Sequence, residues 1–212
     1  SAEPDSKRIE ILRGLRAVVV ISEEMQEVLE RHGVKTFRIP TMSRLPIFTG
    51  ETLPTLKPKA VSIFKDYPRK NASLLRSLSM QGEATGRWSL ELHENPKFDD
   101  AEYLRMIEAV SIYVCTSWQE GGPLPAMDVM SRGGVVVSTP VGQIQELIHH
   151  GESGFICKNE ADFSEILALL FSNPDYLMKT RQAAFASYQK HRSKNAIQKT
   201  VAETFGSILQ SP

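Results

Sequence analysis

The chain has 212 residues, of which 41% are hydrophobic, so it can form one large domain, or a domain and a fragment, around a substantial core. Lysine plus arginine and aspartate plus glutamate number 25 each, which excludes a bulk electrostatic attraction to nucleic acid or anionic lipid. Apolar runs such as residues 17–21 are far too short to span a bilayer.

The first elements alternate between helix and strand. A helical spacing of apolar residues over 5–15 and an apolar run over 17–21 predict a helix followed by a strand. Ser22 is a suitable N-cap for a second helix, which has glutamates in its first turn and ends at Gly33. Another short strand is predicted over 36–39.

Residues 46–58 contain three prolines and few apolar residues, which is typical of an interdomain linker. Residues 60–64 then read as the first strand of a new sheet, and a helix begins after Asn71. Between them, KDYPRKN places three cations within six residues, from Lys65 to Lys70. This segment is either a clamp for a diphosphate or ordinary surface charge.

A polar loop is predicted over 81–87, and alternating hydrophobicity predicts a strand over 88–93. Asp99 is the expected N-cap of the helix that follows. Trp118 either lines a pocket or covers the core, and we favour the core.

From Ser111 to Lys158 the chain alternates short buried strands with short helices. The strands are expected at 112–115, 135–137 and 155–157, and the helices at 125–132 and 144–149. This order predicts a parallel sheet with crossover helices. Three further helices are expected in the C-terminal part, beginning near Asn159, Asn173 and Ala196.

The two cysteines, Cys115 and Cys157, both end strand-like runs. They read as buried core residues of a reducing compartment, with a disulfide as the less favoured alternative. Neither lies in a CxxC or Cys/His spacing, so no metal site is expected.

The loop from Gln119 to Pro125 follows a predicted strand and opens a helix. In an open parallel sheet such loops form a crevice at the carboxyl ends of the strands, where free amides favour an anion such as phosphate. The alternative is a simple tight turn. Glu120 and Asp128 could accept hydrogen bonds from sugar hydroxyls, or they could be a helix-end complement and a solvated acid on the polar side of the helix.

The stretch EGGPLPAMDVMSRGGVVVSTPVGQIQELI, residues 120–148, resembles the donor-binding block of family 4 retaining glycosyltransferases of the GT-B fold. That block carries E-G-F-G-L-P-x-x-E-A-M-A-x-G-x-P-V-V, then a Gly-Gly turn and a Glu. The positions in register are Glu120, Gly121, Leu124, Pro125, Met130, Gly133, Val136, Val137, Gly142 and Glu146. The departures are Gly122, Pro123, Asp128 and Gln143, which stand where Phe, Gly, Glu and Gly are usual.

The resemblance implies a Rossmann-like open parallel sheet with helices on both faces, as in the C-terminal half of a GT-B enzyme. It also implies catalytic roles for two acids: Glu120 would hydrogen-bond the donor sugar, and Asp128 would contact the ribose. Electrostatic stabilisation of the leaving diphosphate would carry most of the catalysis, with no cofactor and no obligatory metal.

The remaining donor-binding residues follow from the same resemblance. The family has G-R-x-x-P-R-K-G after the first strand, and Lys65 occupies the Arg position while Lys70 matches the Lys. A lysine supplies charge without the bidentate fork of arginine. The implied donor-binding set is completed by the amides and glycines of the two loops, namely Gly121, Gly122, Leu124 and Gly142.

The resemblance further implies a division of the chain. Residues 1–48 are expected to be the remnant of an acceptor-side N-terminal domain with its linker, 49–190 the nucleotide-sugar-binding domain, and 191–212 a C-terminal helix packing back on the N-terminal segment. The expected partners are a nucleotide sugar, a glycan or lipid-linked acceptor, and either the missing N-terminal domain or a second copy of the chain, but no nucleic acid.

The implied function is transfer of a sugar with retention in polysaccharide or cell-surface glycan biosynthesis, by a cytoplasmic protein or one bound peripherally at the inner face of the membrane. The alternative is a non-catalytic glycosyltransferase-like module that binds or scaffolds. Another phosphate-binding α/β domain, such as an epimerase of the same fold, is disfavoured by its different pattern of acids and histidines.

Overall fold

The computed structural model describes residues 5–50 and 52–210, and it contains one large parallel sheet and one small one. The large sheet has the strand order β4-β3-β5-β6-β7, with every neighbouring pair parallel. Its strands are β3 (Ala60–Phe64), β4 (Leu90–Glu94), β5 (Ile112–Cys115), β6 (Val135–Ser138) and β7 (Phe155–Ile156). This confirms the expected Rossmann-like α/β fold.

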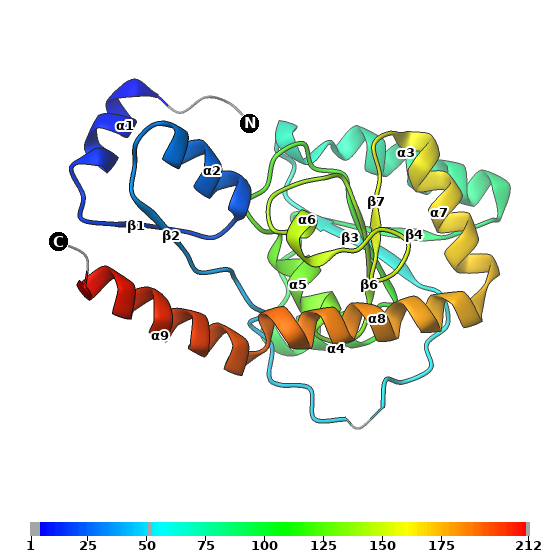
Figure 1. Ribbon diagram of the computed structural model, residues 1–212. Coiled ribbons are helices and arrows are strands. Elements are labelled where there is room, and N and C mark those ends of the chain that lie inside the picture. The colour runs from blue at the N-terminus through cyan, green and yellow to red at the C-terminus, as the bar shows by residue number, and fades with distance from the viewer. Residues whose placement is uncertain (1–4, 51, 211–212) are drawn as a thin grey trace.

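Helices cover both faces of the large sheet (Figure 1). They are α3 (Ala72–Thr85), α4 (Asp100–Glu108), α5 (Leu124–Met130), α6 (Ile144–Leu147), α7 (Glu160–Ser172) and α8 (Pro174–Arg192), with a 3-10 turn at Pro68–Lys70. On one face, α3 and α7 pack against the sheet through Leu78 and Phe163. On the other, α4, α5 and α8 contribute Ile107, Met127 and Ala184. The core therefore has two layers, one on each side of the strands.

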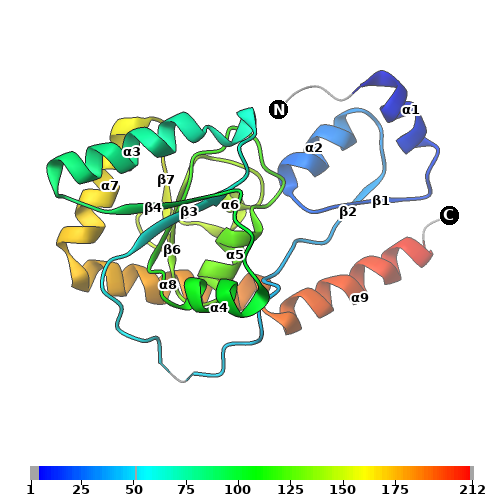
Figure 2. The same ribbon diagram turned by 180° about the vertical axis from the view of Figure 1, so that it is seen from behind.

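A separate N-terminal lobe, residues 5–38, stands beside the large sheet (Figures 1 and 2). It contains α1 (Ser6–Arg13), β1 (Val18–Val20), α2 (Glu23–Arg31) and β2 (Thr36–Arg38), with the two strands parallel. Its core is small, formed by Ile9, Val20, Leu29 and Val34. Residues 39–59, called the linker below, run from the lobe to β3 without helix or strand at any described position.

The last helix, α9 (Lys194–Gln210), leaves the end of α8 and runs back alongside the lobe in both views (Figures 1 and 2). Near its end, the Arg16 guanidinium donates a hydrogen bond to the Leu209 carbonyl (3.2 Å). The apolar side chains of Phe205 and Leu209 remain exposed. The helix thus returns towards the lobe but leaves these two apolar side chains uncovered. No helix among the described residues is long and apolar enough to cross a membrane.

Several local predictions can be checked directly. Ser22 accepts a hydrogen bond from the Met25 amide, and Asp99 forms a full capping box with Glu102, which confirms both N-caps. Both cysteines are free and buried, and burial raises the pKa of Cys157 to about 12. No disulfide therefore links the two.

The expected polar loop over 81–87 is wrong, because α3 continues to Thr85. The polar residues of its last turn face solvent, which made them look like a loop. Gly82 is the exception on the inner side: a Cβ there would lie 2.5 Å from the Trp88 indole nitrogen, so only glycine lets that ring pack. The helix ends at Gly86, whose φ of 64° places it in the left-handed conformation that favours glycine.

Candidate functional site

Two loops meet at the carboxyl ends of the adjacent strands β3 and β5. The first, the cationic loop, spans residues 65–71, and the second, the glycine loop, spans 116–123. The Trp118 amide donates to the Arg69 carbonyl (2.8 Å), and the Thr116 hydroxyl donates to the Lys70 carbonyl (3.1 Å). The structure therefore brings together, at one end of the sheet, the two segments that the sequence singled out for an anionic ligand.

Lys70 and Glu120 form an ion pair between these loops. The Ser117 hydroxyl donates to the same Glu120 oxygen (2.8 Å), which fixes the carboxylate from a second side. Their side chains are only 18% and 11% exposed, so water screens the pair less than it would on an open surface. By contrast Lys65 is exposed, and none of the ion pairs found in residues 5–50 and 52–210 includes it.

The glycines of this region allow close packing between loops. A Cβ on Gly142, whose φ is 46°, would lie 2.3 Å from the Glu120 carbonyl oxygen. A Cβ on Gly122 would lie 2.2 Å from the side-chain amide nitrogen of Gln143. Gly121 and Gly122 are half-buried and Leu124 is exposed, while the buried Pro123 carries no amide hydrogen. The glycine loop and the turn before α6 are thus one compact backbone unit.

Asp128 lies elsewhere than expected. It is completely buried, so the prediction that it occupies the polar side of its helix is wrong. One carboxylate oxygen accepts from the Ser43 hydroxyl (2.7 Å) and the Arg44 amide (3.1 Å), and the other from the Tyr103 hydroxyl (2.7 Å). Burial first, and then this carboxylate, raise the pKa of Tyr103, which keeps the phenol a donor. Both oxygens are occupied by the protein, so the geometry leaves none for a ribose.

The N-terminal lobe and the linker contribute contacts that the sequence did not predict. The Glu24 carboxylate accepts from the Gly142 amide (3.3 Å), and a Cβ on Gly121 would lie 3.0 Å from the Ile21 side chain. Thr41 exchanges two hydrogen bonds with Gln143, each of 2.9 Å. The only signal for these residues was the Ser-Glu-Glu start of α2, which indicated a helix cap and nothing more.

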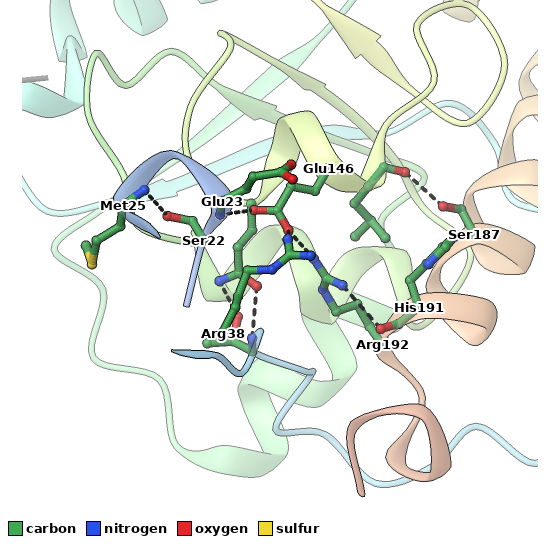
Figure 3. A network of polar contacts seen from close by, with 11 residues as sticks. Ser22, Glu23, Met25, Arg38, Glu146, Ser187, His191 and Arg192 are labelled. Carbon is green, nitrogen blue, oxygen red and sulfur yellow. Dashed lines mark hydrogen bonds and ion pairs between the residues drawn. The ribbon is translucent and has the colours of Figure 1, made fainter. Parts of the chain in front are cut away.

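A second node between lobe and domain centres on Glu146 of α6 (Figure 3). Its carboxylate pairs with Arg38 of β2 and with Arg192 of α8, the latter at 3.2 Å, and accepts from the Glu23 amide at the start of α2 (2.6 Å). The resemblance had matched Glu146 without giving it a role. In the structure it joins α2 and β2 of the lobe to α8, which lies more than 130 residues further along the chain.

Trp118 is 68% exposed, so the expectation that it covers the core is wrong. The core position is taken instead by Trp88, whose indole donates to the Leu78 carbonyl (3.0 Å). Three surface hollows are lined by none of the residues that the sequence put forward for the site, namely Lys65, Lys70, Glu120, Gly121, Gly122, Leu124, Asp128 and Gly142. No cluster of metal-ligating side chains is found in residues 5–50 and 52–210.

The large sheet and its helices have the fold of the C-terminal, Rossmann-like half of GT-B glycosyltransferases. Residues 92–187, just under half of the chain, match the family model described as glycosyl transferases group 1. That segment includes the glycine loop and α6 but not the cationic loop. No curated protein sequence matches the chain.

Solved structures of similar fold extend the comparison. A mutant of TarM from S. aureus, in complex with fondaparinux, alpha-GlcNAc-glycerol and UDP, has a TM-score of 0.76 at 17% identity, over 93% of this chain and 45% of TarM. Sucrose-phosphate synthase from Thermosynechococcus elongatus has a TM-score of 0.76 at 17% identity, over 100% of this chain and 64% of that one. HepE from Anabaena, in complex with UDP-glucose, has a TM-score of 0.74 at 16% identity, over 98% and 70%. The chain thus spans about half of TarM and a larger part of the other two.

Proposed function

We propose that this chain is the donor-binding part of a glycosyltransferase and that it holds a nucleotide sugar at the junction of the cationic and glycine loops. The observation that carries the proposal is the meeting of Lys70 and Glu120 at the carboxyl end of the sheet, inside a fold of the GT-B class. The family match over the glycine loop and the UDP-containing structural neighbours support it.

The ion pair has a chemical use in this proposal. A diphosphate would take Lys70 as its counter-ion, with the exposed Lys65 beside it and the amides of Gly121, Gly122 and Leu124 as donors. Glu120, released from the lysine, would accept a hydrogen bond from a hydroxyl of the donor sugar. Each charge then exchanges one partner for another, so that neither is left buried and unpaired.

Charge on the leaving diphosphate grows during transfer, so the lysines and amides would stabilise the transition state more than the ground state. Gly142 would line the pocket. Asp128 is left out of the contacting set, because both its oxygens are engaged. Retention, a glycan or lipid-linked acceptor and a role in cell-surface glycan synthesis belong to the proposal.

Calorimetric titration with UDP-, GDP- and ADP-sugars tests this proposal. We expect binding heat with the nucleotide sugars of one base. The affinity of Lys70→Ala for that donor should be lower by about tenfold or more, because a charge-assisted contact is lost. Lys57→Ala is the control, since Lys57 is exposed and precedes β3 at the opposite end of the strand. The absence of heat and of a thermal shift with every donor at millimolar concentration would reject the function.

A non-catalytic binding or scaffold module is the second candidate. The burial of Asp128 favours it, because the second acid of the resembled motif has become a structural residue here. Introducing Glu120→Ala in the cell that makes this protein, and measuring the glycan product, separates the two functions. Loss of the glycan product supports the transferase, whereas an unchanged product supports the scaffold.

A further inference from the structure

Two hydrogen bonds link the N-terminal lobe to the segment 142–146, and each side supplies one accepting carboxylate. Glu146 of α6 accepts the Glu23 amide at the start of α2 (2.6 Å), while Glu24, the next residue of α2, accepts the Gly142 amide just before α6 (3.3 Å). These two contacts hold the first turn of α2 against α6 and against the turn before it, which contains Gly142.

The two carboxylates differ in how their charge is balanced. Glu146 lies between Arg38 and Arg192, so its negative charge is more than compensated. Glu24 is half-buried, and none of the ion pairs found in the described parts of the chain includes it. Its uncompensated charge is therefore presented to the backbone unit formed by Gly142 and the glycine loop.

An amide that receives a carboxylate oxygen can equally receive a phosphate oxygen, because both are anionic acceptors. We propose that Glu24 is a built-in competitor: it occupies the Gly142 amide and repels a diphosphate at the glycine loop, so that an anionic ligand must displace it. This inference rests on the proposed function. Because Glu24 belongs to α2, its displacement would remove the contact between the first turn of α2 and the Gly142 turn and leave the contact between the Glu23 amide and Glu146.

The test measures binding of inorganic pyrophosphate and of UDP to three proteins, by calorimetry and by the fluorescence of the exposed Trp118 beside Glu120. Glu24→Gln keeps an oxygen acceptor for Gly142 but removes the charge, and we expect it to bind about three- to tenfold more tightly than the unmodified chain. Glu27→Gln is the matched control, an exposed acid one turn further along α2, and its affinity should stay within about twofold.

Added salt supplies a second readout. At about 1 M salt the advantage of Glu24→Gln should shrink, since screening weakens the repulsion that the substitution removes. Glu24→Ala, checked for folding by its melting temperature, should also bind more tightly, because loss of the charge and not gain of an amide is responsible.

Two results would overturn the inference in different ways. If the unmodified chain binds pyrophosphate but Glu24→Gln binds no more tightly than Glu27→Gln, Glu24 is not a competitor and the proposed function stands. If none of the proteins binds pyrophosphate or UDP, the proposed function is rejected, and the inference that Glu24 is a competitor is rejected with it.

Discussion

At the scale of single residues, Asp128 shows how an acid in a ligand-binding motif can become structural. Its partners Ser43 and Arg44 lie in the linker, and Tyr103 lies in α4, so one carboxylate joins three segments. Arg44 also stacks over the Tyr103 ring, with its guanidinium carbon 4.3 Å from the ring centroid. Because Asp128 is buried and both its oxygens accept hydrogen bonds, it holds the first part of the linker against α5.

Asp128→Asn should therefore destabilise the protein by about 2–4 kcal/mol, because an amide cannot accept from Ser43, Arg44 and Tyr103 at once and leaves buried donors unpaired. Urea unfolding measures the loss. Glu83→Gln, at an exposed acid on α3, should change stability by less than about 0.5 kcal/mol. A stable Asp128→Asn variant with weakened nucleotide-sugar binding would instead show that this acid contacts the ligand.

At the scale of elements, arginine side chains hold the linker in addition to apolar contacts such as Leu45 against the core and Phe48 against Phe185. The completely buried Arg181 of α8 donates to the Gly133 carbonyl after α5 (2.8 Å) and to the Pro54 carbonyl in the linker (2.7 Å). Arg132 donates to the Pro46 carbonyl (2.7 Å). These contacts satisfy linker carbonyls that have no strand partner.

Arg181→Ala should cost about 2–4 kcal/mol, because it leaves the carbonyl of the buried Gly133 without this donor and removes the packing of a large side chain. The linker should also become easier to cleave, so limited proteolysis should cut within 46–58 faster than in the unmodified chain. Lys179→Ala, an exposed position on the same helix, is the control. Equal cleavage rates in the two variants would show that Arg181 does not hold the linker.

The elements also show what a sequence can and cannot predict. Strands β3 and β5 begin and end where expected, because each apolar run is too short for a helix, is rich in β-branched residues and is bounded by polar residues. The caps at Ser22 and Asp99 follow from side chains that bond to nearby amides. Local chemistry of this kind is visible in the order of residues. The last turn of α3 was missed because its exposed face is as polar as a loop.

The candidate site divides in the same way. Lys70 and Glu120 could be selected from residue type and position after a strand, and parallel strands bring such loops to one end of the sheet. Their ion pair, the burial of Asp128 and the approach of Glu24 depend on contacts between distant segments; Glu24 and Gly142 are 118 positions apart. No periodicity or spacing encodes such contacts.

At the scale of the whole molecule, the position of the N-terminal lobe depends on a small number of polar contacts. Its own core is small, and its two-stranded sheet would be marginal alone. Glu146 is the most connected of the lobe contacts, since it bonds β2, α2 and α8 together (Figure 3). The α8 partner, Arg192, is buried at the point where α8 gives way to α9, and its Nε atom has no hydrogen-bond partner.

Glu146→Gln should loosen this lobe without unfolding the large sheet. The neutral amide would leave Arg38 and the buried Arg192 facing each other without a counter-charge, which is costly for the junction but does not touch the core around β3 and β5. We expect amide hydrogen exchange in residues 18–38 to speed up by about tenfold, while exchange in β5 and β6 stays unchanged. Glu165→Gln, at an exposed acid on α7, should alter neither region. Uniform acceleration across lobe and sheet would mean that Glu146 supports global stability, and no acceleration in the lobe would mean that the lobe is held by other contacts.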